Sequence, residues 1–268
     1  WGNFPEHEAW GISTVHECEV SLETLCEFAD KPDVIVHCAG GASVGYSVDH
    51  PKQDFALTVD TTSSVLEYIR LYSPNTKLVY PSSAAVYGQV SSEPIQEKNY
   101  LEPVSPYGTH KLFAESLCRM YAENYGLLIS IVRFFSIYGE GLRKQLLWDA
   151  CCKFTKGRHD FFGSGEEIRD WLHVHDATKL LYLAEAHASN QCVIVNGGAG
   201  RGVKVKNILR RIALSLGTEA VPEFTSEKKA GDPDALVANI SSAQTWDWEP
   251  QVSWEKGVDD YAKWFCSI

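Results

Sequence analysis

The sequence predicts an α/β protein built on a doubly wound parallel sheet, with a smaller lobe toward the C-terminus. Short apolar runs that end in small residues predict buried parallel strands, and stretches of helical periodicity separate them. This alternation of strand and helix patterns becomes less regular after Gly139, where Trp, Gly and Pro become frequent. We therefore expect a sheet domain over residues 1–138 and about 171–198, and a second lobe over 139–170 and 199–268.

The elements of the first half follow one another in the alternating order that a parallel sheet requires. Residues 33–38 form an apolar run that ends in small residues, as a strand that leads into a tight turn would. Residues 54–72 carry apolar positions at helical spacing and stop before a Ser-Pro-Asn turn. Residues 77–80 form the next buried strand, and residues 89–104 form a polar loop.

A long helix is predicted from Ser105, because Ser at the N-cap followed by Pro is a strong helix start. It should run to about Tyr125 and end at Gly126. Strands over residues 128–132 and 192–195 complete the sheet. Trp246, Trp248 and Trp254, near the chain end, are expected to pack in the smaller lobe.

Composition narrows the function classes. The chain has 268 residues and a formal net charge of −11, from 35 acidic and 24 basic residues. An acidic surface repels a polyphosphate backbone, so nucleic acid is a poor partner. No run approaches the roughly 18 apolar residues of a membrane span. Eight cysteines without a disulfide-like spacing predict reduced, buried thiols in a cytoplasmic protein.

Three residues have the chemistry of a proton-transfer site. Tyr107 and Lys111 are four apart on the predicted helix, so they share one face. A phenol has a reference pKa of about 10, and a nearby ammonium favours the phenolate, which can then act as a general base. Ser83 follows a predicted strand, where its hydroxyl can share a proton with Tyr107.

Longer motifs surround these residues, and they resemble the extended short-chain dehydrogenases, especially enzymes of the UDP-galactose 4-epimerase kind. The likeness extends from about Glu17 to Pro250. It is carried by His37-Cys38-Ala39-Gly40-Gly41-Ala42-Ser43-Val44-Gly45, Ser82-Ser83-Ala84-Ala85-Val86-Tyr87-Gly88, Ser105-Pro106-Tyr107-Gly108-Thr109-His110-Lys111, Arg133-Phe134-Phe135-Ser136-Ile137-Tyr138-Gly139, and Gly163-Ser164-Gly165 with Arg169-Asp170-Trp171-Leu172-His173-Val174-His175-Asp176.

The resemblance implies a Rossmann-like dinucleotide-binding domain, a substrate-binding lobe, and NAD as cofactor, with NADP not excluded. It implies a nucleotide-sugar substrate, a role in polysaccharide biosynthesis, and a homodimer formed through residues 65–69 and 112–121. The implied catalytic residues are Ser83, Tyr107 and Lys111. The implied cofactor-binding residues are Glu19, Val20, Cys38, Ala39, Gly40, Thr58, Pro81, Tyr107, Lys111 and Phe135. The implied substrate-binding residues are Ser83, Ser136, Arg169, Lys229 and Asp232, and no metal site is expected.

Departures from the family pattern sharpen the predicted reaction. Dehydratases of this family carry Asp-Glu after the catalytic hydroxyl, and decarboxylases carry Glu; this chain has Ala84-Ala85, which cannot move a proton. Oxidation and re-reduction at C4 needs no further acid. We therefore predict a nucleotide-sugar 4-epimerase, with an NDP-4-keto-sugar reductase as the alternative. Ser136, Lys229 and Thr58 replace the usual Asn, Arg and Asn, which predicts altered ligand preference.

One family feature does not occur in the sequence. The glycine-rich strand–turn–helix that holds the pyrophosphate of the cofactor is not found ahead of Glu17. The resemblance implies that about fifty residues are missing, either because the chain is a fragment or because it has lost this unit. A second hypothesis follows, a non-catalytic nucleotide-sugar-binding remnant.

Overall fold

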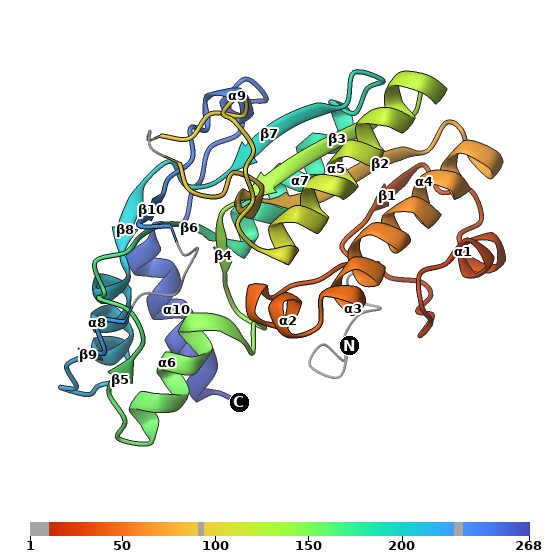
Figure 1. Cartoon of the computed structure of the whole chain (residues 1–268). Helices are drawn as coiled ribbons and strands as arrows, with labels where there is room; N and C mark the ends of the chain where they lie inside the picture. Colours follow the sequence, from red (N-terminus) through yellow and green to blue (C-terminus); the bar gives the residue numbers. More distant parts are fainter. Residues whose placement is uncertain (1–10, 91–93, 228–232) are drawn as a thin grey trace.

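The computed structural model confirms the α/β class and describes residues 11–90, 94–227 and 233–268. Its central sheet has four parallel strands in the order β1-β2-β3-β7 (Figure 1). Their bounds are Val34–Val36 for β1, Lys77–Ser83 for β2, Ile129–Phe134 for β3 and Val193–Gly197 for β7. Each strand lies within the predicted run or extends it toward its C-terminal end, the edge at which ligands bind in such sheets.

Helices cover both faces of the central sheet (Figure 1). On one face lie α1 (Leu22–Phe28), α4 (Thr61–Tyr72) and α5 (Pro106–Tyr125), which share an apolar core with Leu78 and Tyr80. On the other face lies α7 (Val174–Ala186), which shares a core with Val79 and Val132. Successive residues of a strand thus serve opposite cores, which explains the continuous apolar runs of the sequence.

A second, smaller group of elements forms beside the C-terminal end of the central sheet (Figure 1). Strands β10, β6 and β4 pair in parallel, and β8 pairs antiparallel with β6. Strands β5 and β9 form a separate pair, and helices α6, α8 and α10 enclose a common apolar core. The bounds are Ser136–Tyr138 (β4), Gln145–Thr155 (α6), Asp160–Phe161 (β5), Ile168–His173 (β6), Gly202–Lys204 (β8), Val205–Ser215 (α8), Glu223–Phe224 (β9), Ala235–Leu236 (β10) and Trp254–Cys266 (α10).

The helix predicted over residues 54–72 is longer and less regular than its apolar pattern indicates. Helix α2 (Val44–Asp49) comes first, and α3 (Pro51–Phe55) then continues through a π-helical turn, Ala56–Asp60, into α4. Such turns are frequent at functional sites, and this one carries Thr58, a predicted site residue. Helix α5 begins and ends as predicted, with the Ser105 side chain accepting from the Gly108 N–H and Gly126 in the left-handed conformation.

Several predictions about side chains were wrong. Trp246 and Trp248 pack against the core of the central sheet beneath α7, and only Trp254 contacts the core of the smaller lobe. Residues 65–69 supply buried side chains to the sheet core, so they do not form a dimer surface. All eight cysteines are free as predicted, but four of them are exposed rather than buried: Cys18, Cys26, Cys38 and Cys266.

In the described ranges, no helix combines the length and the apolar character that crossing a bilayer requires. The short helix α9 (Ser241–Gln244) precedes α10 in the chain and packs beside β7.

Candidate active site

Ser83 ends β2 and lies at the C-terminal edge of the central sheet. It pairs in register with Phe134 at the end of β3, and Phe134 pairs with Gly197 at the end of β7. The Ser83 hydroxyl accepts from the Ala85 N–H at 3.2 Å, which starts a single 3₁₀ turn. Its side chain also lies close enough to the Tyr107 phenol to lower the pKa of that phenol. Ser83 and Tyr107, which are separated by a long loop in sequence, therefore meet.

Tyr107 lies in the first turn of α5 and is partly buried. Its backbone N–H, which has no partner within the helix, donates to the buried Ser47 hydroxyl at 3.0 Å. Burial raises the pKa of the phenol, the hydrogen bond from Ser83 lowers it, and the negative charge of Asp54 raises it. The phenol is thus neutral in the free site and needs added positive charge to become a base near neutral pH.

Lys111 lies one turn further along α5 and is only 6% exposed. Its ammonium donates to the Pro81 carbonyl at 3.0 Å and lies 4.9 Å from the centre of the Tyr80 ring. Burial lowers the pKa of Lys111 to about 8, although Cys38 and other nearby groups oppose this. A buried ammonium this close to its titration point is typical of functional sites.

The turn after β1 brings backbone close to Lys111. Gly40 has a φ of 150°, and a Cβ there would stand 3.6 Å from Lys111 Nζ, in the space before the ammonium. The Gly41 N–H donates to Thr58 Oγ1 at 2.9 Å. A glycine turn that leaves room beside an ammonium fits the nicotinamide-ribose end of a dinucleotide cofactor.

A buried polar network holds α5 against the central sheet. The Glu115 carboxylate on α5 accepts from Arg133 Nη2 at 2.7 Å and from the Ser82 hydroxyl at 2.6 Å. Arg133 also donates to the Tyr87 hydroxyl at 3.1 Å, and that hydroxyl donates to Asn196 Oδ1 at 2.6 Å. The network joins α5 to β2, β3 and β7, so it fixes the helix relative to the strand ends.

Two residues that sequence reasoning did not single out stand next to this site. Asp54 is fully buried on α3, and its Oδ2 lies 2.6 Å from Nδ1 of His110 on α5. His110 lies inside the motif that carries Tyr107 and Lys111, but Asp54 comes from a segment recognised only by its helical pattern. No local signal pairs the two, because they are 56 residues apart.

The other predicted cofactor-binding residues are more exposed than Lys111. Glu19 is exposed and Val20 half-buried just before α1, while Cys38 is exposed and Ala39 half-buried after β1. Phe135 is half-buried, and its N–H donates to the Gly197 carbonyl at 3.0 Å.

Apart from Ser83, the predicted substrate residues fall on the smaller sheet or outside the described ranges. Ser136 is half-buried at the start of β4 and pairs in register with Trp171 of β6. Arg169, also half-buried, lies on β6, and its Nη1 donates to the Ile168 carbonyl at 2.8 Å. Lys229 and Asp232 lie outside the described residues, so their predicted roles are not tested.

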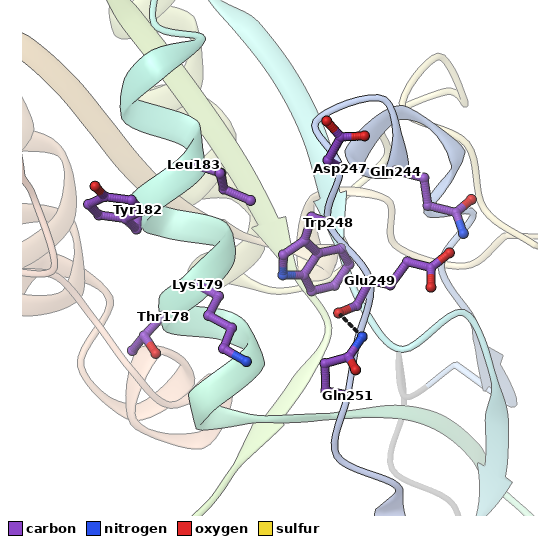
Figure 2. A pocket seen from close by; sticks show the side chains of 9 residues that line it. All are labelled: Thr178, Lys179, Tyr182, Leu183, Gln244, Asp247, Trp248, Glu249 and Gln251. Atoms are coloured by element: carbon purple, nitrogen blue, oxygen red, sulfur yellow. Dashed lines mark hydrogen bonds between the residues drawn. The ribbon is translucent and has the colours of Figure 1, made fainter.

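An open pocket of about 780 Å³ lies elsewhere, between α7 and the segment around Trp248 (Figure 2). Its lining contains none of the predicted site residues. Within it, Gln251 Nε2 donates to the Glu249 carbonyl at 3.3 Å, and the Trp248 indole donates to the Asp176 carbonyl at 3.1 Å. We therefore place the chemistry at the ends of β1 and β2 and on α5, where the titratable groups converge, and not in this pocket.

Comparison with known proteins gives an independent result. A sequence profile described as the NAD dependent epimerase/dehydratase family matches residues 3–197. A UDP-glucose epimerase of Bacillus subtilis is 30% identical over 252 residues, which cover 91% of this chain and 78% of the relative. The UDP-glucose 4-epimerase of Halalkalibacterium halodurans is 30% identical over 240 residues, which cover 82% of this chain and 71% of the relative.

Solved structures agree with this. The UDP-glucose 4-epimerase of Thermotoga maritima, solved with UDP-glucose, superposes with a TM-score of 0.87 at 25% identity and covers 94% of this chain and 84% of its own. A UDP-glucuronic acid 4-epimerase of Bacillus cereus, solved with NAD, gives a TM-score of 0.83 at 24% identity, with 94% and 81% covered. The second likeness concerns the fold alone.

Proposed function

Because the chain belongs to the NAD dependent epimerase/dehydratase family, we propose that it is a nucleotide-sugar 4-epimerase that acts on a UDP-hexose. The observation that carries this proposal is the meeting of three groups: the Ser83 side chain lies close enough to the Tyr107 phenol to lower its pKa, and Lys111, one helical turn from Tyr107, donates to the carbonyl of Pro81, two residues before Ser83. These are the groups needed to move one proton at one sugar hydroxyl. The names of the relatives support UDP-sugars as the substrate class.

In the proposed mechanism, Tyr107 takes the proton of the sugar 4-hydroxyl as the C4–H bond breaks. When bound, NAD supplies the hydride acceptor at C4 and, in its oxidised form, a positive charge that favours the phenolate. Ser83 hydrogen-bonds the sugar oxygen and aligns it with the phenol. Inversion requires the 4-keto sugar to present its other face to the cofactor, which would supply the hydride there, and Tyr107 gives the proton back to the same oxygen. Protons and electrons balance within one cycle.

The cofactor is proposed to lie along the end of β1. Gly40 leaves room before Lys111, whose ammonium would hold the nicotinamide ribose, and Cys38, Ala39 and Phe135 would border the ring. Glu19 and Val20 would lie beside the adenine. Thr58 would act by fixing the glycine turn, because its side-chain hydroxyl accepts from the Gly41 N–H, and Pro81 by accepting from Lys111 through its backbone carbonyl.

The residues after Ser83 favour epimerisation over the family's other reactions. Ala84 and Ala85 form the 3₁₀ turn that follows Ser83, and Ala84 is buried. A Cβ on Gly108 would stand 2.5 Å from the Ala85 carbonyl, so this turn is pressed against α5. Neither alanine can act as the acid that a dehydratase needs to expel the 6-hydroxyl of the sugar. Inversion at C4 does not need such an acid. Ser136, Arg169, Lys229 and Asp232 are proposed to hold the nucleotide diphosphate and sugar.

A cytoplasmic location, the homodimer and a role in polysaccharide synthesis also remain predictions. If a dimer forms through α4 and α5, exposed apolar residues near those helices would supply it. Phe113 is 47% exposed on α5, and Leu57 is 46% exposed in the turn before α4. Sedimentation of the wild type and of Phe113→Ser tests this: the substituted chain should dissociate at a higher concentration.

The proposed function is tested by following interconversion of UDP-glucose and UDP-galactose with NAD present. Wild type should reach the same equilibrium mixture from either side. Tyr107→Phe should lose all measurable turnover while keeping its far-UV spectrum and its Tm. Tyr182→Phe is the matched control, since Tyr182 is 79% exposed on α7 and away from the site.

Three results would overturn the proposal. An unchanged rate in Tyr107→Phe would remove this residue from the chemistry. Net consumption of NADPH with a 4-keto sugar nucleotide, without epimerisation, would make the protein a reductase. Calorimetric binding of UDP-sugars without any binding of NAD would make it a non-catalytic nucleotide-sugar binder.

A further inference from the structure

A buried Asp–His pair joins α3 to α5, and these helices lie against each other (Figure 1). Asp54 is 0% exposed and His110 is 8% exposed. Asp54 Oδ2 lies 2.6 Å from His110 Nδ1, and since an ionised carboxylate can only accept, His110 is the donor. Asp54 Oδ1 is also buried and has no hydrogen-bond partner in the described part of the chain.

The unpartnered oxygen of Asp54 points at the glycine turn after β1. A Cβ built on Gly41 would stand 1.9 Å from Oδ1 of Asp54, so a side chain there is excluded. The same Cβ would stand 3.3 Å from Thr58 Oγ1, which accepts from the Gly41 N–H. The carboxylate therefore lies in direct contact with the Gly40–Gly41 turn, whose backbone is proposed to border the cofactor.

At its other end the pair is connected to the catalytic residues. His110 immediately precedes Lys111 on α5 and follows Tyr107 by three residues, so it moves with both. The negative charge of Asp54 raises the pKa of Tyr107 and opposes the lowering of the pKa of Lys111 by burial. Cys38, Glu115 and Cys118 also face Lys111 and act on it in the same direction as Asp54.

The position of the unpaired oxygen against the glycine turn, and not its burial alone, points to a role at the site. Burying a carboxylate with one oxygen unpaired is costly, and such costs are concentrated at functional sites. The cost is incurred here at the contact between the glycine turn and the helix that carries Tyr107 and Lys111.

We propose that Asp54 and His110 are positioning residues for Tyr107 and Lys111: the pair holds the Gly40–Gly41 turn against α5 and places a fixed negative charge behind the phenol and the ammonium. This inference rests on the proposed function, because it concerns the same site. It adds two residues that act on the reaction without contact to the sugar.

The first test compares Asp54→Asn with Asp176→Asn. Asp176 is a matched control, because it is also 0% exposed, has one unpartnered oxygen, and lies at the start of α7. We expect Asp54→Asn to lower kcat about tenfold through misplacement of the turn. Both limbs of its pH profile should move to lower pH by about half a unit to one unit, because the lost charge favoured the protonated forms of Tyr107 and Lys111.

The Asp176→Asn control and substitutions of His110 show whether the effect belongs to the Asp54–His110 pair. Asp176→Asn should lower Tm without moving either limb of the pH profile. His110→Leu should lower kcat at least as much as Asp54→Asn, whereas His110→Gln, which keeps an N–H donor, should recover part of the loss. An Asp54→Asn enzyme whose limbs stay in place, or a control whose limbs move equally, would overturn the proposal.

A readout without turnover separates this inference from the proposed function. The phenolate of Tyr107 is titrated by ultraviolet absorbance, with the Tyr107→Phe protein subtracted, in wild type and in Asp54→Asn. The midpoint should fall in Asp54→Asn. If the wild type is inactive but the midpoint falls, the proposed function fails and the placement of Asp54 stands. If the wild type is active and the midpoint is unchanged, the placement of Asp54 fails alone.

Discussion

The Lys111 ammonium donates to the Pro81 carbonyl at 3.0 Å, so helix α5 is joined to the end of the central strand β2. The contact is possible because Pro81 lies at the carboxyl end of the strand and Lys111 faces it from one turn inside α5. Burial at this contact lowers the pKa of Lys111 to about 8. Two predictions follow from that value.

The first concerns the pH dependence of the wild type. The proposed mechanism uses the ammonium form of Lys111, whose pKa is about 8. Turnover should therefore fall as pH rises through about 8, and the basic limb of kcat/KM should be lost in Lys111→Arg, because Arg does not titrate in this range. A basic limb above pH 10 would contradict the buried, perturbed state of Lys111.

The second concerns stability. The pKa of Lys111 is about 10.5 when exposed and about 8 in the folded chain, so below pH 8 the folded state bears the full cost of a buried charge. Lys111→Met should abolish activity yet raise the free energy of unfolding at pH 7 by about 2–3 kcal/mol. The gain should shrink as pH rises from 8 to 10.5. Urea unfolding at pH 7 and pH 10 measures it; a destabilised Met variant would contradict the argument.

The Ser83 hydroxyl gives a third prediction, because its hydrogen bond lowers the pKa of Tyr107. In Ser83→Ala the pKa of the phenol should rise, the acidic limb of kcat should move to higher pH, and kcat at pH 7 should fall about a hundredfold. The matched control is Ser130→Ala, since the buried Ser130 hydroxyl has no partner within the described residues. Equal losses in the two variants would mean that Ser83 acts through packing only.

Gly41 provides a fourth prediction that needs no assay of turnover. A Cβ there overlaps Asp54, so Gly41→Ala should lower the free energy of unfolding by about 1–3 kcal/mol and weaken NAD binding, as read by calorimetry. Gly45→Ala is the control: a Cβ at that position has its nearest neighbour at 3.9 Å, and alanine is the better helix former in α2. Normal NAD binding by Gly41→Ala would place the cofactor elsewhere.

The fifth prediction concerns the buried ion pair below the site. Glu115 and Arg133 have side chains 0% and 1% exposed. Glu115→Ala leaves the guanidinium buried without its carboxylate and should cost about 3–5 kcal/mol. Glu185→Ala removes the partner of Lys77 from a half-exposed pair and should cost about 0–1 kcal/mol. Denaturant midpoints compare the two, and similar costs would show that Arg133 finds other partners.

Much of the fold was predictable because its signals are local. The strands at residues 34–36 and 77–83 are apolar runs that end in small residues, and α5 begins at Ser105-Pro106 and ends at Gly126 for reasons contained in a few neighbouring residues. The spacing of Tyr107 and Lys111 is likewise set by one helical turn. The π-helical turn Ala56–Asp60 was not predictable, since apolar periodicity does not distinguish it from an α-helix.

The sequence by itself therefore determined the four strands of the central sheet in their order along the chain, the helix α5, and the motifs that carry Ser83, Tyr107 and Lys111. Only the tertiary structure decided which distant residues support them. Asp54 contacts His110, which is 56 residues away in the sequence, and Trp246 packs beneath α7 instead of in the smaller lobe. Such contacts depend on how helices and strands pack together, and this packing produces no periodic pattern in the sequence. Neighbouring residues specify where each helix and strand begins and ends. Burial and close contact between these elements specify the pKa values of the site residues and the distances between them.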